Sequence, residues 1–398
     1  MTQLDLDLCY LTATEAIARF KARTLSPVEL TSALIARSLA LNPTLNVLTE
    51  LKTEAALAAA RVAEGRYSKA KSARPRPLEG VPVAIKDFHS VKDERTTYGS
   101  KAYADFKPAN SAPTVARLLD AGAILLSRTT TPELAHGGIT KSPLWGVSRN
   151  PWNPQYTCGG SSGGSGAAVA AGMTTIADGT DGGGSIRIPA ALNGIFGYKP
   201  PFGRNPLDLD HPLETLLHYG PMTRSVADAA LMQNVMSGQH VMDICSLRDA
   251  CVLPEKFAAI RGLKIAVSMN LGYVEVAEDV QKNTREAIAV LKRLGAKVEE
   301  VDLGWNETVL DAWQTWWEGL FAGLCGDLLP RWRHHLTPLV EQLLESGLRH
   351  TGVQMYKTNQ VRGWMYQTLG PILEKYDALV CPTLAVSCLD AEHDDMAK

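Results

Sequence analysis

One glycine-rich stretch of the sequence places a serine where the backbone could help it react. In TTIADGTDGGGSIRIPAALNG (residues 174–194), an apolar run ends at Ala177, and a glycine turn then leads to Ser185 at the start of a short predicted helix. The helix start adds positive potential, and three backbone N–H groups before the serine would be free to converge on one point. These N–H groups belong to Gly182, Gly183 and Gly184. The pattern predicts an oxyanion hole beside a nucleophilic serine, which is the equipment for attack on a carbonyl group.

A second glycine-rich stretch, TCGGSSGGSGAAVAAG (residues 157–172), offers another place for a reactive serine. It lacks the lysine of a phosphate-binding P-loop, and neither stretch contains the GxGxxG pattern of dinucleotide-binding proteins. Residues 159–163 satisfy GxSxG, the nucleophile elbow of α/β-hydrolases, but the preceding SRNPWNPQYTC is not the buried strand that an elbow requires. A Ser-His-Asp hydrolase that uses Ser161 or Ser162 is therefore a minor alternative.

Lys86 is the candidate base for such a serine. A serine hydroxyl needs a base before it can attack a carbonyl group, and no histidine lies close in sequence to either glycine-rich stretch. Lys86 ends the apolar segment GVPVAIK, and an ammonium group that is removed from water loses proton affinity. A neutral Lys86 could then accept the proton. The alternative is that its side chain reaches solvent or pairs with Asp87.

The elements that must position these residues alternate between strands and helices. Ser26 is a predicted N-cap with Pro27 at the first helical position, and VPVAIKD has the alternation of a strand. Residues 111–127 predict a helix and then a strand, and residues 263–302 predict a strand, a helix and a strand. This alternation indicates one large α/β domain with a parallel or mixed sheet.

The chain resembles the amidase signature family in four segments that occur in the family's order. These segments are GVPVAIKD, GGSSGGSGAAVAAG, GTDGGGSIRIPAALNGIFGYKP and GPMTRSVADAALM. The match is dense over residues 78–232 and thinner on both sides. The resemblance implies an α/β amidase signature fold, in which a large mixed, mostly parallel β-sheet is covered by α-helices on both faces.

The family's Ser, cis-Ser, Lys triad falls on three residues of this sequence. The resemblance implies that Ser185 is the nucleophile, that Lys86 is the base, and that Ser161, after a cis peptide bond, passes protons between them. Gly182, Gly183 and Gly184 would supply the oxyanion N–H groups, and Asp181 and Arg187 would support their loop.

The resemblance also implies a domain organisation. Residues 1–398 form a single amidase signature domain, with an N-terminal helical layer at 1–70, a catalytic core at 78–232, and a variable substrate-side region with the last strands at 233–398. Family members usually continue for some tens of residues beyond the strand that DALVCPTLAV resembles, so we expect the family's C-terminal segment to be missing here. A truncated sequence, a partner strand that completes the sheet, or a shortened form would each account for this.

The composition points away from polyanionic partners. Forty basic and forty-two acidic residues leave a net charge of −2, which gives no electrostatic reason to expect nucleic acid or an anionic membrane. The N-terminal MTQLDLDLCYL is acidic where a signal peptide is basic, and no run of apolar residues is long enough to span a bilayer, so we expect a cytoplasmic protein. The seven cysteines show neither a disulfide framework nor metal-ligand spacing, and we expect no metal and no cofactor.

A tryptophan-rich segment, WNETVLDAWQTWWEGLFAGL (residues 305–324), bears on the substrate. Trp313, Trp317 and Phe321 are spaced four apart, as on one face of a helix, and such a face is more often core than binding site. Trp316 points off this face, and Gly182 stands where family members commonly have a larger residue. We therefore predict Trp316 and Trp313 as substrate-binding residues for an apolar or aryl substrate.

Together these features predict an amidohydrolase that cleaves a small-molecule carboxylic amide, or also an ester or carbamate, through a seryl acyl-enzyme. The alternative is the amidase-like glutaminase subunit of a glutamine-dependent amidotransferase, although nothing in the sequence suggests a basic, tRNA-facing surface. The sequence leaves the oligomeric state open, with a homodimer among the options.

Overall fold

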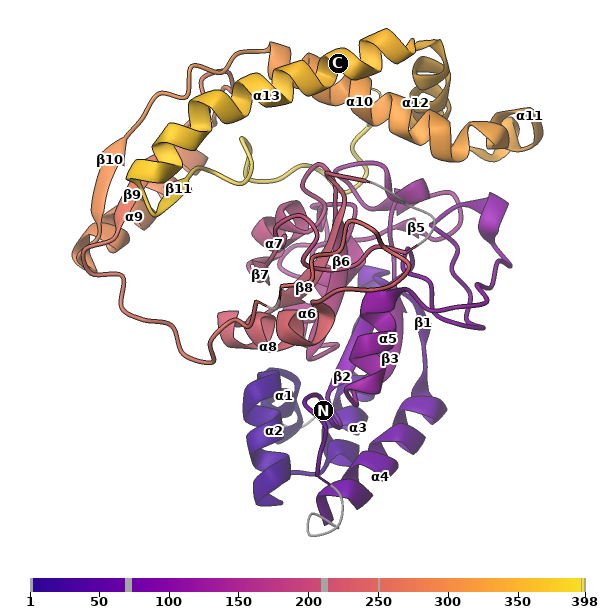
Figure 1. Cartoon of the computed structure of the whole chain (residues 1–398). Helices are drawn as coiled ribbons and strands as arrows, with labels where there is room; N and C mark the ends of the chain where they lie inside the picture. Colours follow the sequence, from indigo (N-terminus) through magenta and orange to yellow (C-terminus); the bar gives the residue numbers. More distant parts are fainter. Residues whose placement is uncertain (1–2, 69–73, 209–213, 250, 395, 397–398) are drawn as a thin grey trace. The chain divides into compact units, whose positions relative to one another are not determined.

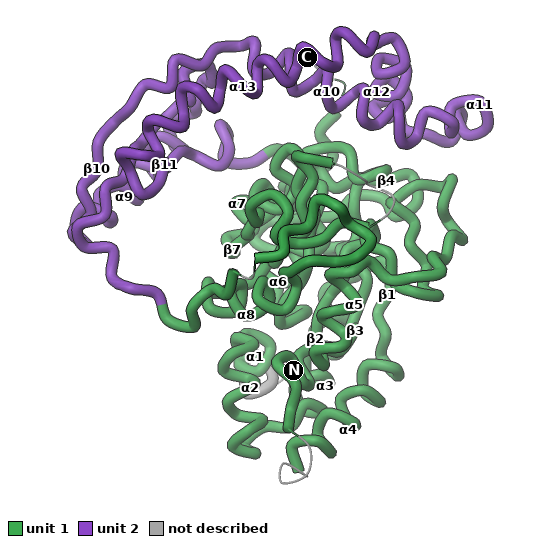
Figure 2. Tube along the Cα trace, in the orientation of Figure 1, with its two compact units in different colours: residues 1–256, 389–398 green, residues 257–388 purple. Residues whose placement is uncertain are grey.

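The computed structural model describes residues 3–68, 74–208, 214–249, 251–394 and 396 (Figure 1). The chain divides into two compact units, one formed by residues 1–256 with 389–398 and the other by residues 257–388 (Figure 2). Both glycine-rich stretches and Lys86 belong to the larger unit. The single-domain organisation expected from the sequence stays a prediction.

The larger unit begins with helices, which are α1 (Gln3–Cys9), α2 (Ala13–Ala22), α3 (Pro27–Leu45) and α4 (Thr53–Ser68). Helix α3 starts at Pro27 as predicted, because the Ser26 side chain accepts the N–H of Val28 and a capping box with Glu29 completes the first turn. Apolar side chains of α2, α3 and α4 form one core cluster with β3 (Ile124–Thr129). These helices therefore pack on one another and on the sheet, while the boundaries of an N-terminal helical layer at 1–70 stay a prediction.

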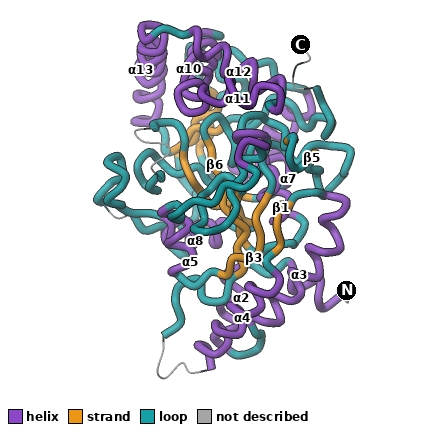
Figure 3. The backbone as a smooth tube through the Cα atoms, turned by 90° about the vertical axis from the view of Figure 1, so that its right-hand side faces the viewer, coloured by secondary structure: helices purple, strands orange, loops and turns teal. Residues whose placement is uncertain are grey.

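A six-stranded mixed sheet forms the centre of the larger unit. Its strand order is β1 (Leu48–Leu51), β3, β2 (Pro82–Lys86), β6 (Ile176–Asp181), β8 (His218–Thr223) and β7 (Phe196–Gly197). Strand β2 pairs in parallel with β3 and with β6, whereas the other three pairs are antiparallel. Strands β1 and β3 run side by side in Figure 3. The predicted α/β fold with a mixed sheet is confirmed, but this sheet is not mostly parallel as predicted, since only its two central pairs are parallel.

The remaining helices of this unit are α5 (Pro113–Asp120), α6 (Gly163–Ala170), α7 (Arg187–Asn193) and α8 (Val226–Met236), and a small hairpin joins β4 (Lys141–Ser142) to β5 (Gly146–Val147). The predicted helix and strand in residues 111–127 are α5 and β3.

Strand β2 is buried on both faces, and its alternation decides where Lys86 can point. Val83 and Ile85 lie in the core cluster that also holds side chains of α5 and α8. Ala84 packs instead with Val169 of α6 and with β6. Because successive side chains of a strand point to opposite faces, Lys86 follows Ala84 on the α6 face.

Strand β6 is longer than its apolar run indicates. The run ends at Ala177, where we expected a turn, but the strand continues through Asp181 and stays buried over its whole length. The extra residues include Asp178 and Thr180, whose polar side chains are bound by other parts of the protein. Such partners are not visible in the local sequence.

The smaller unit contains a three-stranded parallel sheet in the order β10 (Lys297–Glu300), β9 (Lys264–Val267) and β11 (Ala378–Val380). Helix α9 (Glu278–Arg293) connects β9 to β10, which confirms the strand, helix and strand predicted in residues 263–302. Its other helices are α10 (Thr308–Cys325), α11 (Leu329–Trp332), α12 (Pro338–Arg349) and α13 (Gly352–Lys375). Within the described ranges of both units, no helix is long and apolar enough to cross a membrane.

Candidate active site

Lys86 ends β2 as a completely buried side chain. Its Nζ donates hydrogen bonds to Ser161 Oγ and to Thr180 Oγ1, each at 2.7 Å. Burial lowers the pKa of Lys86 to about 7, although the negative charges of Asp178 and Asp181 act in the opposite direction. Lys86 therefore combines contact with a serine and a proton affinity suited to a base at neutral pH.

Lys86 neither reaches solvent nor pairs with Asp87, which were the two alternatives considered for its side chain. Its side chain has no solvent-exposed surface, so it does not reach solvent. The Asp87 carboxylate is bound elsewhere: it accepts the Thr97 N–H at 2.8 Å and the Trp145 indole N–H at 3.2 Å, and it lies 3.8 Å from the guanidinium of Arg128.

Ser161 follows a cis peptide bond, Gly160–Ser161, and stands two residues before the start of helix α6. The glycines around it are needed because other backbone comes very close. A Cβ at Gly160 would lie 2.6 Å from the carbonyl oxygen of Gly137, and one at Gly164 would lie 2.5 Å from the backbone nitrogen of Thr130. The glycine-rich stretch is therefore a close-packing device that seats Ser161 against Lys86.

Ser162 joins the two glycine-rich stretches. Its backbone N–H donates to the carbonyl oxygen of Ser185 at 3.1 Å, and its Oγ accepts the N–H of Thr180 at 3.1 Å. Ser185 is partly exposed, at the turn between β6 and α7. Its Oγ has no hydrogen-bond partner in the described part of the chain. The structure thus brings the backbones of the two serine-bearing segments together and pairs Ser161 directly with Lys86.

Asp181 fastens the loop that carries Ser185. Its carboxylate accepts the N–H of Gly184 at 2.9 Å and the N–H of Ile186 at 3.2 Å, and it receives two hydrogen bonds from the Arg187 guanidinium at 2.8 and 2.7 Å. Burial favours the neutral acid, but the hydrogen bonds from Arg187 and the charges of Lys199 and Arg187 hold the pKa of Asp181 well below its usual range. Asp181 thus remains a charged anchor for the loop.

The backbone donors before Ser185 differ from one another. The Gly184 N–H is occupied by Asp181, and Gly184 has a φ of +127°, which suits glycine. Within the described residues, the N–H groups of Gly182, Gly183 and Ser185 have no hydrogen-bond partner. The carbonyl oxygen of Gly182 is held by Lys199 Nζ at 3.0 Å. Of the three N–H groups predicted for an oxyanion hole, that of Gly184 is thus bound by Asp181, and the role of all three stays a prediction.

Two further polar residues were not anticipated from the sequence. Thr180 accepts the second hydrogen bond of Lys86, and Ser162 holds Thr180 and Ser185 in place. Thr180 stands next to Asp181 in the motif, and Ser162 follows Ser161 directly, so their closeness to the motif residues was the signal available.

The hydrogen bonds of Ser161 and Ser162 among the described residues run to Lys86, Thr180 and backbone groups. None of these partners is a histidine. His218 Nδ1 lies 2.8 Å from the carbonyl oxygen of Leu216, while His211 lies outside the described residues. Over the described ranges, no group of three or more His, Cys, Asp or Glu side chains could hold a metal ion.

Trp313 and Trp316 belong to α10 of the smaller unit. The predicted helical face is present, because the Trp313 and Trp317 rings stack at 5.4 Å and the Trp317 and Phe321 rings lie 4.8 Å apart. Trp317 and Phe321 are buried, whereas 38% of Trp313 is exposed and Trp316 is half-buried. A substrate-binding role for Trp313 and Trp316 stays a prediction.

The chain is similar to known sequences over most of its length. The Amidase family model matches residues 29–397. The acylamidase of Rhodococcus erythropolis is 37% identical over 385 residues, which cover 95% of this chain and 80% of that protein. One subunit of the glutamyl-tRNA(Gln) amidotransferase of Chloroflexus aurantiacus is 41% identical over 302 residues, or 75% of this chain and 61% of that relative.

Solved structures give the same result. A bacterial aryl acylamidase of the amidase signature family is 28% identical, with a TM-score of 0.91 and coverage of 98% of this chain and 82% of that chain. A fatty acid amide hydrolase is 25% identical, with a TM-score of 0.86 and coverage of 97% of this chain and 70% of that chain. The family match, the fold and the motif-bearing segments agree: this chain belongs to the amidase signature family of hydrolases.

Proposed function

We propose that this protein hydrolyses carboxylic amides through a seryl acyl-enzyme, with a preference for apolar or aryl substrates. The observation that carries the proposal is the buried Lys86, whose Nζ contacts Ser161 Oγ and whose pKa is lowered by burial to about 7. An uncharged amine held against a hydroxyl is equipped to receive a proton, which is what a serine nucleophile requires. Esters and carbamates present the same acyl carbon and fall within the same chemistry.

In the proposed reaction, Ser185 Oγ attacks the amide carbon as its proton passes through Ser161 to Lys86. The tetrahedral intermediate then expels the amine, which leaves with the proton returned from Lys86 through Ser161. Water then attacks the acyl-enzyme while its proton passes through Ser161 to Lys86. The carboxylic acid is released, and Ser185 is regenerated as the proton returns to it. The missing hydrogen bond at Ser185 Oγ is consistent with this role, because catalytic hydrogen bonds often tighten only when substrate is bound.

Charge that develops on the carbonyl oxygen would be stabilised by backbone N–H groups. We assign this role to Gly182, Gly183 and Ser185, whose N–H groups have no partner in the described part of the chain. Gly184 takes a different part, since Asp181 already occupies its N–H and thereby fixes the loop. Preorganised donors of this kind act without reorganisation during the reaction.

The preference for aryl substrates is supported by two similarities and one feature of the chain. The chain is similar to an acylamidase and to the structure of a bacterial aryl acylamidase. Gly182 carries no side chain beside the nucleophile, which leaves room for a bulky acyl or amine group. Trp313 and Trp316 are our candidates for contacts with an aryl group.

Covalent labelling tests the nucleophile. A fluorophosphonate should modify Ser185, and mass spectrometry of the digested protein should locate a single adduct there. Labelling should disappear in Ser185→Ala and persist in the control Ser225→Ala, since Ser225 caps helix α8 and has no part in the proposed chemistry. An adduct on Ser161 or Ser162 instead would contradict the assignment.

A glutaminase subunit of a glutamine-dependent amidotransferase is the second candidate. It is supported by the similarity to one component of the glutamyl-tRNA(Gln) amidotransferase of Chloroflexus aurantiacus. A stand-alone amidase should hydrolyse 4-nitroacetanilide as a purified protein. A glutaminase subunit should release ammonia from glutamine only when a partner protein and a nucleotide are added. A cytoplasmic location and a homodimer remain predictions from the sequence.

A further inference from the structure

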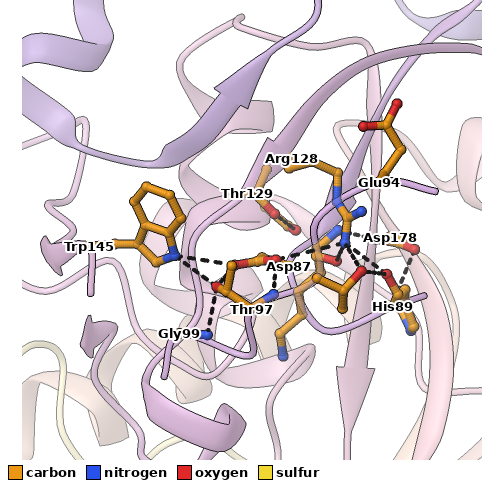
Figure 4. A network of polar contacts seen from close by, with 12 residues as sticks. Asp87, His89, Glu94, Thr97, Gly99, Arg128, Thr129, Trp145 and Asp178 are labelled. Carbon is orange, nitrogen blue, oxygen red and sulfur yellow. Dashed lines mark hydrogen bonds and ion pairs between the residues drawn. The ribbon is translucent and has the colours of Figure 1, made fainter. Parts of the chain in front are cut away.

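A second buried polar pair lies beside the base and has no part in the proposed reaction. Asp178 of β6 and His89, in the turn after β2, have no exposed surface, and His89 Nδ1 lies 2.6 Å from Asp178 Oδ2 (Figure 4). The Tyr219 ring packs edge-on against the imidazole, with 4.2 Å between ring centroids. His89 Nε2 is buried without a hydrogen-bond partner in the described part of the chain, and the Nδ1–Oδ2 approach is a close ion-pair contact that lacks hydrogen-bond geometry.

The pair reaches the base through the backbone. Asp178 Oδ1 accepts the backbone N–H of Lys86 at 2.7 Å. The registered pairing of β2 with β6 ends at Ala84 and Ala177, so a side chain holds β6 to the last residue of β2. One carboxylate therefore accepts the Lys86 N–H with one oxygen and lies in close contact with His89 Nδ1 through the other.

The other end of the Lys86 residue is held by Arg128 of β3. Its guanidinium donates to the His89 carbonyl oxygen at 2.8 Å (Figure 4) and to the Lys86 carbonyl oxygen at 3.2 Å. The His89 N–H also donates to the Lys86 carbonyl oxygen, at 3.0 Å, which closes the turn. The Lys86 backbone is thus fixed on both its N–H and its carbonyl side.

We propose that the His89–Asp178 pair is a positioning device for catalysis, which holds the backbone of Lys86 so that Nζ stays on Ser161 and which sets the charge beside the base. The inference rests on the proposed function, because it takes Lys86 as the base. His89 and Asp178 are positioning residues, since they act through Lys86 and not on the substrate.

Position matters because the base must meet Ser161 at hydrogen-bond distance. A displacement of about 1 Å in a catalytic group can cost roughly 10²-fold in rate. The Lys86 side chain is long, and its backbone is the fixed end from which Nζ reaches Ser161 and Thr180. Loss of the Asp178 carboxylate would free that end, and loss of His89 would free Asp178.

Charge matters because the Asp178 carboxylate lies beside a buried amine. The charged and titratable groups around Lys86 come from β6, from β3 and from its own turn, and they are Asp178, Asp181, Arg128, Asp87 and His89. Helix α6, which packs on the same side, carries no charged residue. Removal of the Asp178 charge leaves a less negative environment, in which the ammonium form of Lys86 is less favoured.

The test measures kcat, KM and the pH dependence of kcat/KM for hydrolysis of 4-nitroacetanilide by variants of the full chain. Asp178→Leu removes both the acceptor and the charge, and we expect kcat to fall at least about tenfold with KM little changed. Asp178→Asn keeps an oxygen for the Lys86 N–H, so most of kcat should return. In this variant, the fall of kcat/KM on the acidic side of the pH profile, the acidic limb, should move to lower pH by about half a unit or more. The negative charge that favours the ammonium form of Lys86 is then gone.

Variants at His89 distinguish a role of its polar contact with Asp178 from a role in filling space. His89→Asn places an N–H donor near the position of Nδ1, and it should retain kcat within about threefold. His89→Leu fills the space without a donor and should behave like Asp178→Leu. Should Asp178→Leu or His89→Leu fail to fold, the Asp178→Asn pH profile and the His89→Asn rate decide the question.

Asp228→Asn is the matched control. Asp228 is also buried in the larger unit, and its carboxylate likewise accepts backbone N–H groups, those of Ala13 and Thr14. We expect this variant to keep the wild-type acidic limb. An equal shift in Asp228→Asn, or an unshifted limb in Asp178→Asn, overturns the inference. If Lys86→Ala retains activity, the proposed function fails; if it is inactive while the Asp178 and His89 variants match wild type, this inference alone fails.

Discussion

The predicted base and the predicted substrate-binding tryptophans are held in contrasting ways. Lys86 is completely buried, makes two hydrogen bonds through Nζ, and has its backbone bound on both sides. Trp313 has 38% of its surface exposed and stacks on Trp317, and Trp316 contacts the same ring at 6.0 Å. One region depends on directional polar contacts, whereas the other depends on contacts between rings.

This contrast suggests that the residues around Lys86 determine the reaction rate and that the tryptophans determine the preference among substrates. Directional contacts fix a group to within the tolerance that proton transfer needs. Ring contacts contribute apolar area, and they tolerate small shifts in geometry. Substitutions around Lys86 should therefore change the rate for every substrate, whereas substitutions at Trp316 should change the ranking of substrates.

The strongest test of this contrast is Lys86→Ala. We expect kcat/KM to fall at least about 10³-fold for aryl and aliphatic amides alike, because the proton of Ser185 loses its acceptor. Circular dichroism and thermal unfolding should show a folded protein. The measurement is the initial rate of hydrolysis of 4-nitroacetanilide and of acetamide.

Histidine variants provide the control for that test. His218→Asn should keep near wild-type activity, since Asn can still hydrogen-bond the Leu216 carbonyl oxygen. A change at His211 should also be mild. An inactive histidine variant beside an active Lys86→Ala would contradict the triad and return a Ser-His-Asp mechanism to consideration.

The sequence allowed some of this to be predicted because the signals are local. Ser26 with Pro27 marks the start of α3, and the spacing of Trp313, Trp317 and Phe321 marks a face of α10. These features depend on caps and periodicity within one element. The motif segments likewise placed Lys86 and the serines through a resemblance that needs no knowledge of contacts.

The rest depends on partners that are distant in sequence. Asp178 is a polar residue in the middle of a buried strand, and its partners Lys86 and His89 lie about ninety residues earlier. No local pattern predicts that pairing, so the strand was expected to end before Asp178. In the same way, the loss of a free N–H at Gly184 follows from how the Asp181 side chain folds back, which sequence spacing does not determine.

Two glycine substitutions, one in each unit, test the difference in packing through the free energy of unfolding. A Cβ at Gly164 of α6 would lie 2.5 Å from the backbone nitrogen of Thr130, so Gly164→Ala should destabilise the larger unit by about 1–3 kcal/mol or more. Gly323 of α10 has no atom within 4 Å of an added Cβ, and Gly323→Ala should stabilise the helix by up to about 1 kcal/mol.

Thermal unfolding and activity of both variants would be measured side by side. We expect a lower unfolding temperature and reduced kcat for Gly164→Ala, and an equal or higher unfolding temperature with unchanged kcat for Gly323→Ala. Equal behaviour of the two variants would argue against the close packing around Ser161.

The pH dependence tests the state of the base. Burial lowers the pKa of Lys86 to about 7, so the neutral form that accepts a proton is lost as the pH falls below 7. We therefore expect kcat/KM for 4-nitroacetanilide, which does not titrate in this range, to level off above pH 8 and to fall by about tenfold per pH unit well below 7. A profile that is flat from pH 5 to pH 9 would contradict a titrating base.

The smallest expected effect concerns Trp316, and it tests the preference side of the comparison. An aryl group that buries apolar area gains roughly 25 cal/mol for each Å² removed from water, so a phenyl-sized substituent should raise kcat/KM over that for acetamide by at least about tenfold. If Trp316 contributes about 40 Å² of that contact, Trp316→Ala should reduce the ratio of aryl to acetamide rates by about fivefold, with the acetamide rate unchanged. Trp332→Ala, a change to another tryptophan of the smaller unit, is the control and should leave the ratio as in wild type.

Equal or better turnover of acetamide in the wild-type protein would refute the aryl preference. An unchanged ratio in Trp316→Ala would leave that preference standing and assign Trp316 to packing within its unit.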